Sequence, residues 1–224
     1  MKDKIFLLFF ILAFMAGVVY AETFYKNVAF STNITLQSCI NNYAPPTGNV
    51  TFGGVPFSLG STPMSWNSSV AAGGGAGTVN LDIQVNLFGI TEVHTLISTW
   101  WGTTGNYASL TFYGSGGTTY TKSLYGNSDI RDYLNGSYTN SINGTTTTQV
   151  WSGSIYRIDK QTILLPTAFQ SETLVSIRLS DWGNNSLQRT FLSGVAVGYV
   201  PEPSTWMLCF FAFLGLGFLK KRNT

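Results

Sequence analysis

The chain has 224 residues, of which 44% are hydrophobic and only 10% charged, and its formal net charge is +2. Five of the twelve Lys and Arg residues and one of the ten Asp and Glu residues lie in segments 1–21 and 220–222. The remainder has seven basic and nine acidic residues, a net charge of −2. No basic patch is left between the ends, and this excludes nucleic acid as an expected partner.

The first 21 residues have the layout of a secretory signal peptide. Lys2 and Lys4 supply a positive n-region, residues 5–19 are apolar, and the segment Val19-Tyr20-Ala21 offers small residues at the cleavage positions. We therefore expect export, with signal-peptidase cleavage after Ala21. A retained N-terminal anchor is the alternative.

Residues 22–200 are expected to form a single all-β domain, because strand patterns follow one another without a convincing amphipathic helix. The clearest pattern is Val79–Leu87, where apolar and polar residues alternate strictly. Phe88-Gly89 interrupts it. A second strand over Ile90–Trp101 is expected to pair with the first through a short turn.

Glycine-rich turns and further strands continue the β pattern. Tyr107–Tyr113 and Thr118–Tyr125 flank a glycine-rich turn and predict a hairpin. Cys39 is the only cysteine of the domain, so core burial is expected to hold the fold without a disulfide, with Cys39 itself buried. These features predict an antiparallel β-sandwich. The other expected strands are Asn33–Gln37, Val50–Phe52, Phe57–Leu59, Gln149–Asp159, Thr173–Ser180 and Phe191–Tyr199.

The segment 201–224 combines three features in a set order: Pro201-Glu202-Pro203, an apolar run over 204–219, and a basic tail at 220–222. The prolines favour an extended segment, the run can enter a bilayer as a transmembrane helix, and the cations stay on the cytoplasmic side. At ~1.5 Å per residue the run spans about 24 Å, short of a ~30 Å hydrocarbon core. A marginal anchor suits a segment held only until it is processed.

This arrangement resembles the PEP-CTERM sorting signal of Gram-negative bacteria, with Pro201, Glu202 and Pro203 as the sorting motif. The resemblance implies processing by an exosortase, a membrane-embedded cysteine protease-transpeptidase. It also implies an intermediate anchored in the inner membrane with its domain in the periplasm, followed by delivery to the cell surface or extracellular matrix. An ordinary C-terminal anchor, in which Pro-Glu-Pro is only a linker, is the alternative.

Three segments of the domain, Gly53–Phe57, Leu96–Gly102 and Asp129–Tyr133, resemble a recurrent domain of sorted bacterial proteins that is similar to galactose-binding-like and discoidin-like jelly rolls. The resemblance implies a jelly-roll sandwich, with carbohydrate as one class of ligand and a structural calcium ion in some members. It does not choose among these outcomes.

Few residues of the domain are candidates for catalysis. His94 is the only histidine, which excludes the usual multi-histidine zinc sites, and it is expected at a half-exposed strand position without a functional role. A glycoside hydrolase would need paired carboxylates, for which Asp129 and Asp132 are the candidates, and this is the least favoured alternative. We therefore expect a protein that is not an enzyme, and the sequence assigns it no cofactor.

Asp129, Arg131 and Asp132 form the densest charged cluster, and they are candidates to bind sugar hydroxyls or to join backbone carbonyls around calcium. An internal salt bridge with loop backbone is the favoured alternative. Trp100 and Trp101 are also candidates, because consecutive strand residues point to opposite faces and an exposed indole can stack on a sugar ring. Core packing is the alternative for each tryptophan.

Together these observations predict an exported surface or matrix protein whose domain binds an extracellular polysaccharide without catalysis. The alternative is a structural matrix or envelope building block that has no discrete ligand site. The expected partners are the exosortase, the polysaccharide and, before processing, the membrane.

Overall fold

The computed structural model describes residues 22–29, 34–35, 46–59, 64–65, 78–136, 138–183 and 188–201, with only the backbone described at 34–35 and 64–65. The predicted signal peptide with Ala21, Cys39, the motif residues Glu202 and Pro203, and the apolar run 204–219 lie outside these residues. Among the residues described, no helix is both long and apolar enough to cross a membrane.

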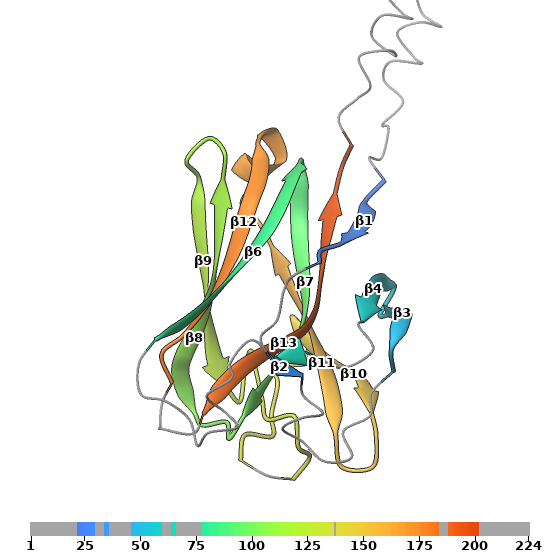
Figure 1. Ribbon diagram of the computed structural model, residues 1–224, viewed down its shortest axis with the longest axis vertical. Helices are drawn as coiled ribbons and strands as arrows, with labels where there is room; N and C mark the ends of the chain where they lie inside the picture. The colour runs from blue at the N-terminus through green and yellow to red at the C-terminus, as the bar shows by residue number, and fades with distance from the viewer. Residues whose placement is uncertain are drawn as a thin grey trace, which may run out of the picture.

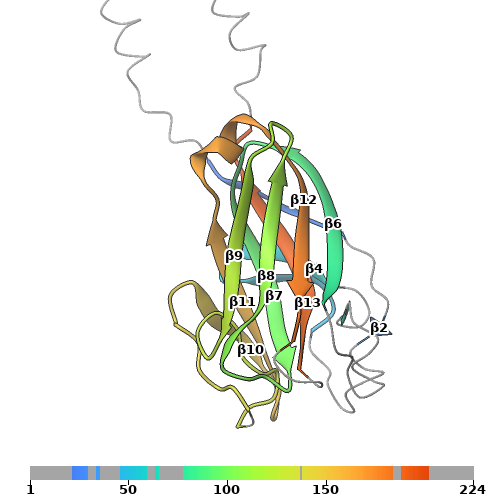
Figure 2. The ribbon, with the colours of Figure 1, turned by 90° about the vertical axis from the view of Figure 1, so that its left-hand side faces the viewer.

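Two antiparallel sheets pack face to face, which confirms the predicted β-sandwich (Figure 1). The five-stranded sheet has the order β1 (Phe24–Asn27), β13 (Arg189–Tyr199), β7 (Ile90–Trp100), β11 (Arg157–Leu164) and β10 (Thr147–Ser152). The four-stranded sheet has the order β6 (Val79–Phe88), β12 (Thr173–Asp181), β8 (Gly105–Gly114) and β9 (Thr119–Gly126), and it faces the viewer in Figure 2.

Three smaller elements complete the described chain. The hairpin β3–β4 joins Gly48–Phe52 to Val55–Leu59, and a second short pair joins β2 (Ile34–Thr35) to β5 (Met64–Ser65). A single 3-10 turn, η2, covers Thr167–Ser171 and buries Phe169.

Two predictions about the strands are wrong, one about pairing and one about extent. β6 and β7 do not form a hairpin: β6 pairs with β12, whereas β7 pairs with β11 and β13 in the opposite sheet. Gly89, at φ +74°, turns the chain from one sheet to the other, and it is fixed there by its N–H bond to Glu172 O. The predicted strand Gln149–Asp159 is two strands, β10 and β11, joined by a turn near Gly153.

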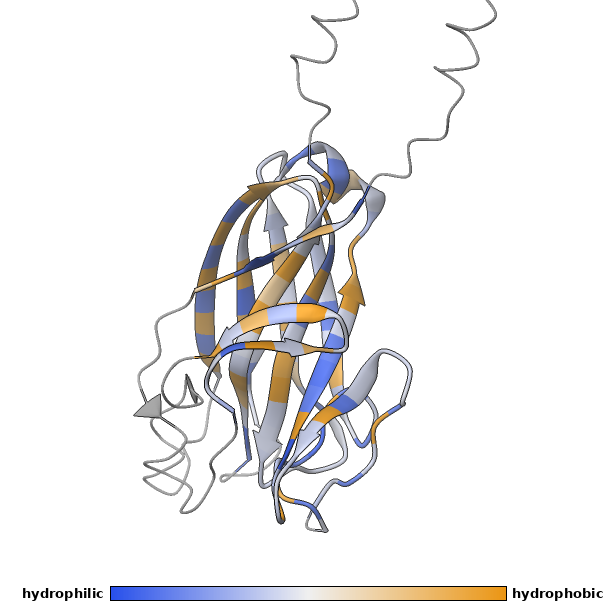
Figure 3. Ribbon diagram, turned by 90° about the vertical axis from the view of Figure 1, so that its right-hand side faces the viewer, coloured by the Kyte–Doolittle hydropathy of each residue, from blue (hydrophilic) through white to orange (hydrophobic). Residues whose placement is uncertain are grey.

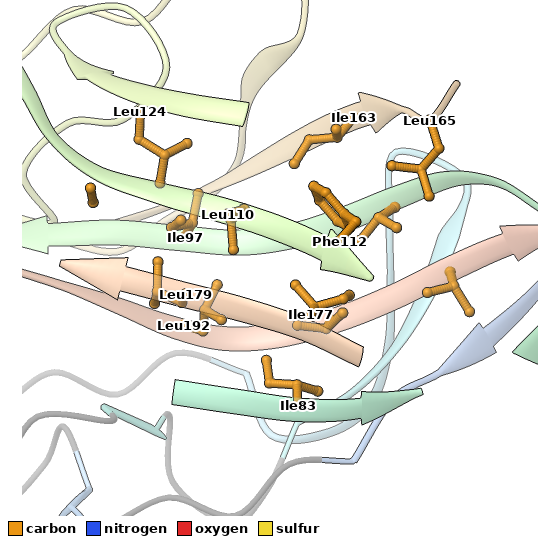
Figure 4. Packing of buried hydrophobic residues seen from close by; sticks show 14 of the residues in the cluster. Ile83, Ile97, Leu110, Phe112, Leu124, Ile163, Leu165, Ile177, Leu179 and Leu192 are labelled. Carbon is orange, nitrogen blue, oxygen red and sulfur yellow. The ribbon is translucent and has the colours of Figure 1, made fainter. Parts of the chain in front are cut away.

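The main core lies between the sheets and is wholly apolar at its centre (Figure 4). Leu110, Phe112, Ile177 and Leu179 of the four-stranded sheet are at most 1% exposed. They belong to one cluster with side chains of the five-stranded sheet, among them Ile97, Ile163 and Leu192. The alternation in β6 is explained by this core, since its apolar residues point inward and its polar residues reach solvent.

A second core lies on the outer face of the five-stranded sheet, under the β3–β4 hairpin, which crosses the strands in Figure 3. Phe52, Val55, Phe57 and Leu59 of the hairpin pack on apolar residues of β7, β11 and β13, namely Leu96, Ile158 and Ala196. A Cβ at Gly194 would lie 3.2 Å from Phe57, Leu59 and Leu96, so glycine permits this close approach. β7 and β13 are therefore buried on both faces, which hides the alternation expected of a half-exposed strand.

The two ends of the sandwich differ in content. β1 begins and β13 ends at the upper end in Figure 1, where Phe24 pairs with Tyr199 and Val200 donates its N–H to Gly89 O at 3.1 Å. The opposite end carries the longest described loop, that between β9 and β10, together with the short loop between β7 and β8. We call this the loop end; it comprises the described residues of 101–106, 125–146, 152–156 and 182–188.

Candidate ligand-binding site

The loop end is drawn together by backbone contacts between its segments. Thr99, at the end of β7, forms a bridge with Asp132, and Leu134 forms another with Tyr156 of the β10–β11 turn. Trp182 continues β12 by donating its N–H to Tyr107 O at 3.0 Å. Both sheets and the long 127–146 loop therefore meet at one surface.

The two consecutive tryptophans lie on opposite sides of this surface, as their adjacency predicts. Trp100 points inward, packs against the main core and stacks on Tyr133 with ring centroids 5.5 Å apart. Trp101 points outward and is 37% exposed. The cause differs from simple strand alternation, because β7 ends at Trp100 and Trp101 takes a left-handed backbone conformation with φ +54°.

Trp101 stacks on Tyr138, with ring centroids 5.4 Å apart and an interplanar angle of 29°. Tyr138 is 55% exposed and also has a left-handed backbone, with φ +50°. We call Trp101 and Tyr138 the aromatic pair. Left-handed conformations are unfavourable for bulky residues and persist only where the surroundings enforce them. Two of them in one exposed stacked pair therefore require a firm scaffold beneath.

Asp132 supplies the first part of that scaffold. Its carboxylate, buried to 1% exposure, accepts the N–H of Gly102 at 3.0 Å and that of Leu134 at 2.9 Å. Its own N–H donates to Thr139 O at 3.0 Å, next to Tyr138. Burial raises the pKa of Asp132 from 3.8 to about 6, although these N–H groups and Arg157 oppose the rise. One aspartate thus ties together both loops that carry the aromatic pair.

Two buried arginines supply the second part. Arg131 makes a bidentate pair with Asp159, both N···O distances being 2.7 Å, and donates to Asn140 O at 3.0 Å. Arg157 donates from Nε to Asp132 O at 2.8 Å and from Nη2 to Thr139 O at 3.1 Å. Burial, and then the charge of Arg131, lower the pKa of Arg157. Planar guanidinium groups with several donors are suited to bridging loop carbonyls in this way.

Asp129 completes the charged cluster. Its carboxylate lies 2.6 Å from Lys122 Nζ and accepts the N–H of Tyr125 at 3.1 Å. Asp129, Arg131 and Asp132 are 4%, 8% and 1% exposed, and their segment is irregular loop. Their expected role as direct ligand contacts is therefore corrected to a structural one, because burial and internal partners occupy them. The alternative of an internal salt bridge with loop backbone describes the contacts.

A further buried polar group joins the two sheets at the loop end, and sequence reasoning missed it. Asp181 accepts the N–H of Gly183 at 2.7 Å and lies 3.6 Å from Arg189 Nη1. Gln188, directly before β13, donates from Nε2 to Thr99 Oγ1 of β7 at 3.0 Å and to Asp181 Oδ2 of β12 at 3.3 Å. Burial raises the pKa of Asp181. The available signal was a charged residue at the facing ends of two strands, because Asp181 ends β12 and Arg189 begins β13.

His94 is not half-exposed, as expected from sequence, but 3% exposed. The ring of Tyr25 from β1 lies edge-on to it at 5.5 Å, and Nε2 lies 3.1 Å from Glu92 Oε1. Its Nδ1 is 3.1 Å from Thr162 Oγ1. Burial lowers the pKa of His94, which favours the neutral ring. These residues lie on the outer face of β7, away from the loop end.

No three His, Cys, Asp or Glu side chains converge as a metal site would within the part of the chain that the structure describes. The exposed groups of the loop end are instead aromatic rings, amides and hydroxyls. Besides the aromatic pair, Tyr125 and Trp182 are 48% and 40% exposed there. Such a surface can stack on a flat apolar face and hydrogen-bond to hydroxyls around it.

Comparison of the chain with protein-family models gives no match, and comparison with curated proteins gives none either. The function of the loop end is therefore inferred from its own residues.

Proposed function

We propose that this protein is an exported cell-surface or extracellular-matrix protein whose β-sandwich binds an extracellular polysaccharide through the aromatic pair. One observation carries the binding half of the proposal: Trp101 and Tyr138 are exposed, stacked and held in left-handed backbone by buried ion pairs and hydrogen bonds. A fold that maintains two such residues at its surface keeps them for contact with a partner. The jelly-roll kinship of the sandwich is part of the same proposal.

The sorting half rests on the two ends of the sequence. Pro201-Glu202-Pro203, the apolar run and the basic tail form the proposed exosortase signal, and residues 1–21 form the proposed signal peptide. The described fold supports this arrangement, because β13 ends at Tyr199 and the motif begins two residues later. Both described termini also lie at the end opposite the aromatic pair, so an anchored chain would present the pair away from the membrane (Figure 1).

The sorting proposal is tested in a Gram-negative host that carries an exosortase, by following the protein in membrane, periplasmic and extracellular fractions. Replacing Pro201, Glu202 and Pro203 together by alanine is expected to leave the chain in the inner membrane at its unprocessed mass. An unaltered distribution would favour an ordinary anchor with a proline-rich linker.

The binding proposal is tested with the full chain, purified in detergent, and the host's own extracellular polysaccharide, with and without calcium. Saturable binding that is weakened in Trp101→Ala supports the proposal. The matched control is Phe24→Ala, which removes an aromatic residue of similar exposure, 44%, from the opposite end. Absence of binding in both conditions would favour a structural building block of the matrix.

A further inference from the structure

The exposed surface of the loop end is electrically neutral. Within the described residues of 101–106, 125–146, 152–156 and 182–183, every residue that is exposed is uncharged. The charged residues of these segments are Asp129, Arg131 and Asp132, and all three are buried. The surface is composed of aromatic rings and the aliphatic side chain of Ile155, with amides, hydroxyls and glycines between them.

The buried charges are also compensated from inside. Asp129 is paired with Lys122 at 2.6 Å, Arg131 with Asp159 at 2.7 Å, and Asp132 with backbone N–H groups. Each charge is thus held within a few ångströms of an opposite charge or a donor dipole. Little electrostatic potential is left to attract an ion to the aromatic pair.

This pattern discriminates between classes of polysaccharide. A uronate or sulfated sugar must lose water from its anionic group on binding, and exposed Arg or Lys donors at the contact are the strongest side-chain partners that offset this cost. The described loop end offers none. A neutral sugar has no such requirement: its C–H face can lie on an aromatic ring, and its hydroxyls can exchange water for amides such as those of Asn135 and Asn140.

We infer that the aromatic pair selects neutral sugar rings and rejects anionic ones. The inference rests on the proposed function, which it deepens by naming the ligand class. The buried arginines have a second effect. Because Arg131 and Arg157 face inward, they hold the loops in place without offering a positive charge to an acidic polysaccharide.

The test uses matched polymers that share a backbone and differ in charge: dextran with dextran sulfate, and hydroxyethyl cellulose with carboxymethyl cellulose. Binding of the full chain in detergent is measured by affinity electrophoresis at low and high salt. We expect at least one neutral polymer to bind with an affinity independent of salt, and its anionic counterpart to bind about tenfold more weakly or not at all.

Variants connect the result to the site. Trp101→Ala and Tyr138→Ala are each expected to lower the affinity for the neutral polymer about fivefold to tenfold, and Phe24→Ala to leave it unchanged. Tighter binding of the anionic polymers, lost at high salt, would overturn the neutral-sugar inference while polysaccharide binding stands. Neutral binding unchanged in both loop-end variants would overturn the assignment to the aromatic pair. Binding to no member of any pair would overturn the proposed function itself.

Discussion

Between the sheets, the buried side chains around Phe112 are apolar, and the stability of this core depends on how well their volumes fill the space. At the loop end, the charged side chains of Asp132 and Arg131 are buried beside Arg157 and Asp159 of β11, and their stability depends on the direction of hydrogen bonds and on charge pairing. Apolar cores accept many sequences of suitable volume, whereas a buried ion pair is stable only with its partner present. We call the core between the sheets the tolerant centre, because it accepts many apolar substitutions. We call the loop end the exacting end, because each of its buried charges needs its partner, and it carries the exposed aromatic residues.

The largest expected effect comes from the tolerant centre. Phe112→Ala removes a side chain of 0% exposure and leaves a cavity, so we expect the free energy of unfolding to fall by about 4 kcal/mol in urea denaturation. Phe24→Ala at an exposed position is the control. A loss below about 1 kcal/mol for Phe112→Ala would mean that the sheets are not held by this core.

The exacting end is tested by Arg131→Met, which keeps much of the stem but leaves the wholly buried Asp159 without its partner. We expect a loss of about 3 kcal/mol in the same measurement, together with changed fluorescence of Trp100 and Trp101. The matched control is Arg178→Met, which breaks an Arg–Asp pair exposed to water on the four-stranded sheet. Equal losses for the two variants would contradict the distinction between buried and exposed pairs.

The pH dependence of the free energy of unfolding also tests the buried charges of the loop end. The pKa of Asp132 is raised to about 6 in the fold, so between about pH 4 and pH 6 the folded chain keeps a proton that the unfolded chain has lost. The free energy of unfolding from this group therefore falls as the pH rises through that interval and stays lower above it. Relative to Asp132→Asn, the wild type is expected to lose about 2 to 3 kcal/mol between pH 4 and pH 6.5. Subtracting the two curves removes the common contribution of Asp181 and His94. A flat difference would mean that Asp132 is not desolvated.

The smallest expected effect concerns the backbone of Trp101. At φ +54° a glycine is relaxed and an alanine is not, so Trp101→Gly should be more stable to unfolding than Trp101→Ala by about 1 kcal/mol, although both bind the polysaccharide more weakly. Equal stabilities would show that the left-handed conformation is not maintained without the indole.

Much of the fold follows from sequence patterns, but strand partners do not. The alternation over Val79–Leu87 identifies β6 and its buried face, and the glycines after Tyr113 identify the β8–β9 hairpin. Alternation specifies which face is buried and says nothing of which strand lies alongside, so the β6–β7 pairing was wrong. The 149–159 segment was read as one strand because residues on both sides of its turn are β-formers.

The candidate site was visible only in part. Trp101 could be singled out because two adjacent tryptophans must diverge, but its partner Tyr138 lies in a loop of Ser, Thr and Asn that has no periodicity. The density of charged residues at 129–132 identifies the cluster in the sequence. It does not show whether the side chains face the interior or the solvent, because a buried ion pair and an exposed binding site use the same residue types. The distinction depends on Asp159 and Lys122, which only the fold brings near.

The pairing of β1 with β13 has a consequence for the order in which the chain acquires structure. β13 lies between β1 and β7, so among the described strands β1 has no hydrogen-bonding neighbour until β13 has emerged. Contacts of such long sequence separation close slowly and late. The five-stranded sheet therefore cannot be completed on a growing chain until residues near Tyr199 are available, whereas all strands of the four-stranded sheet precede β13.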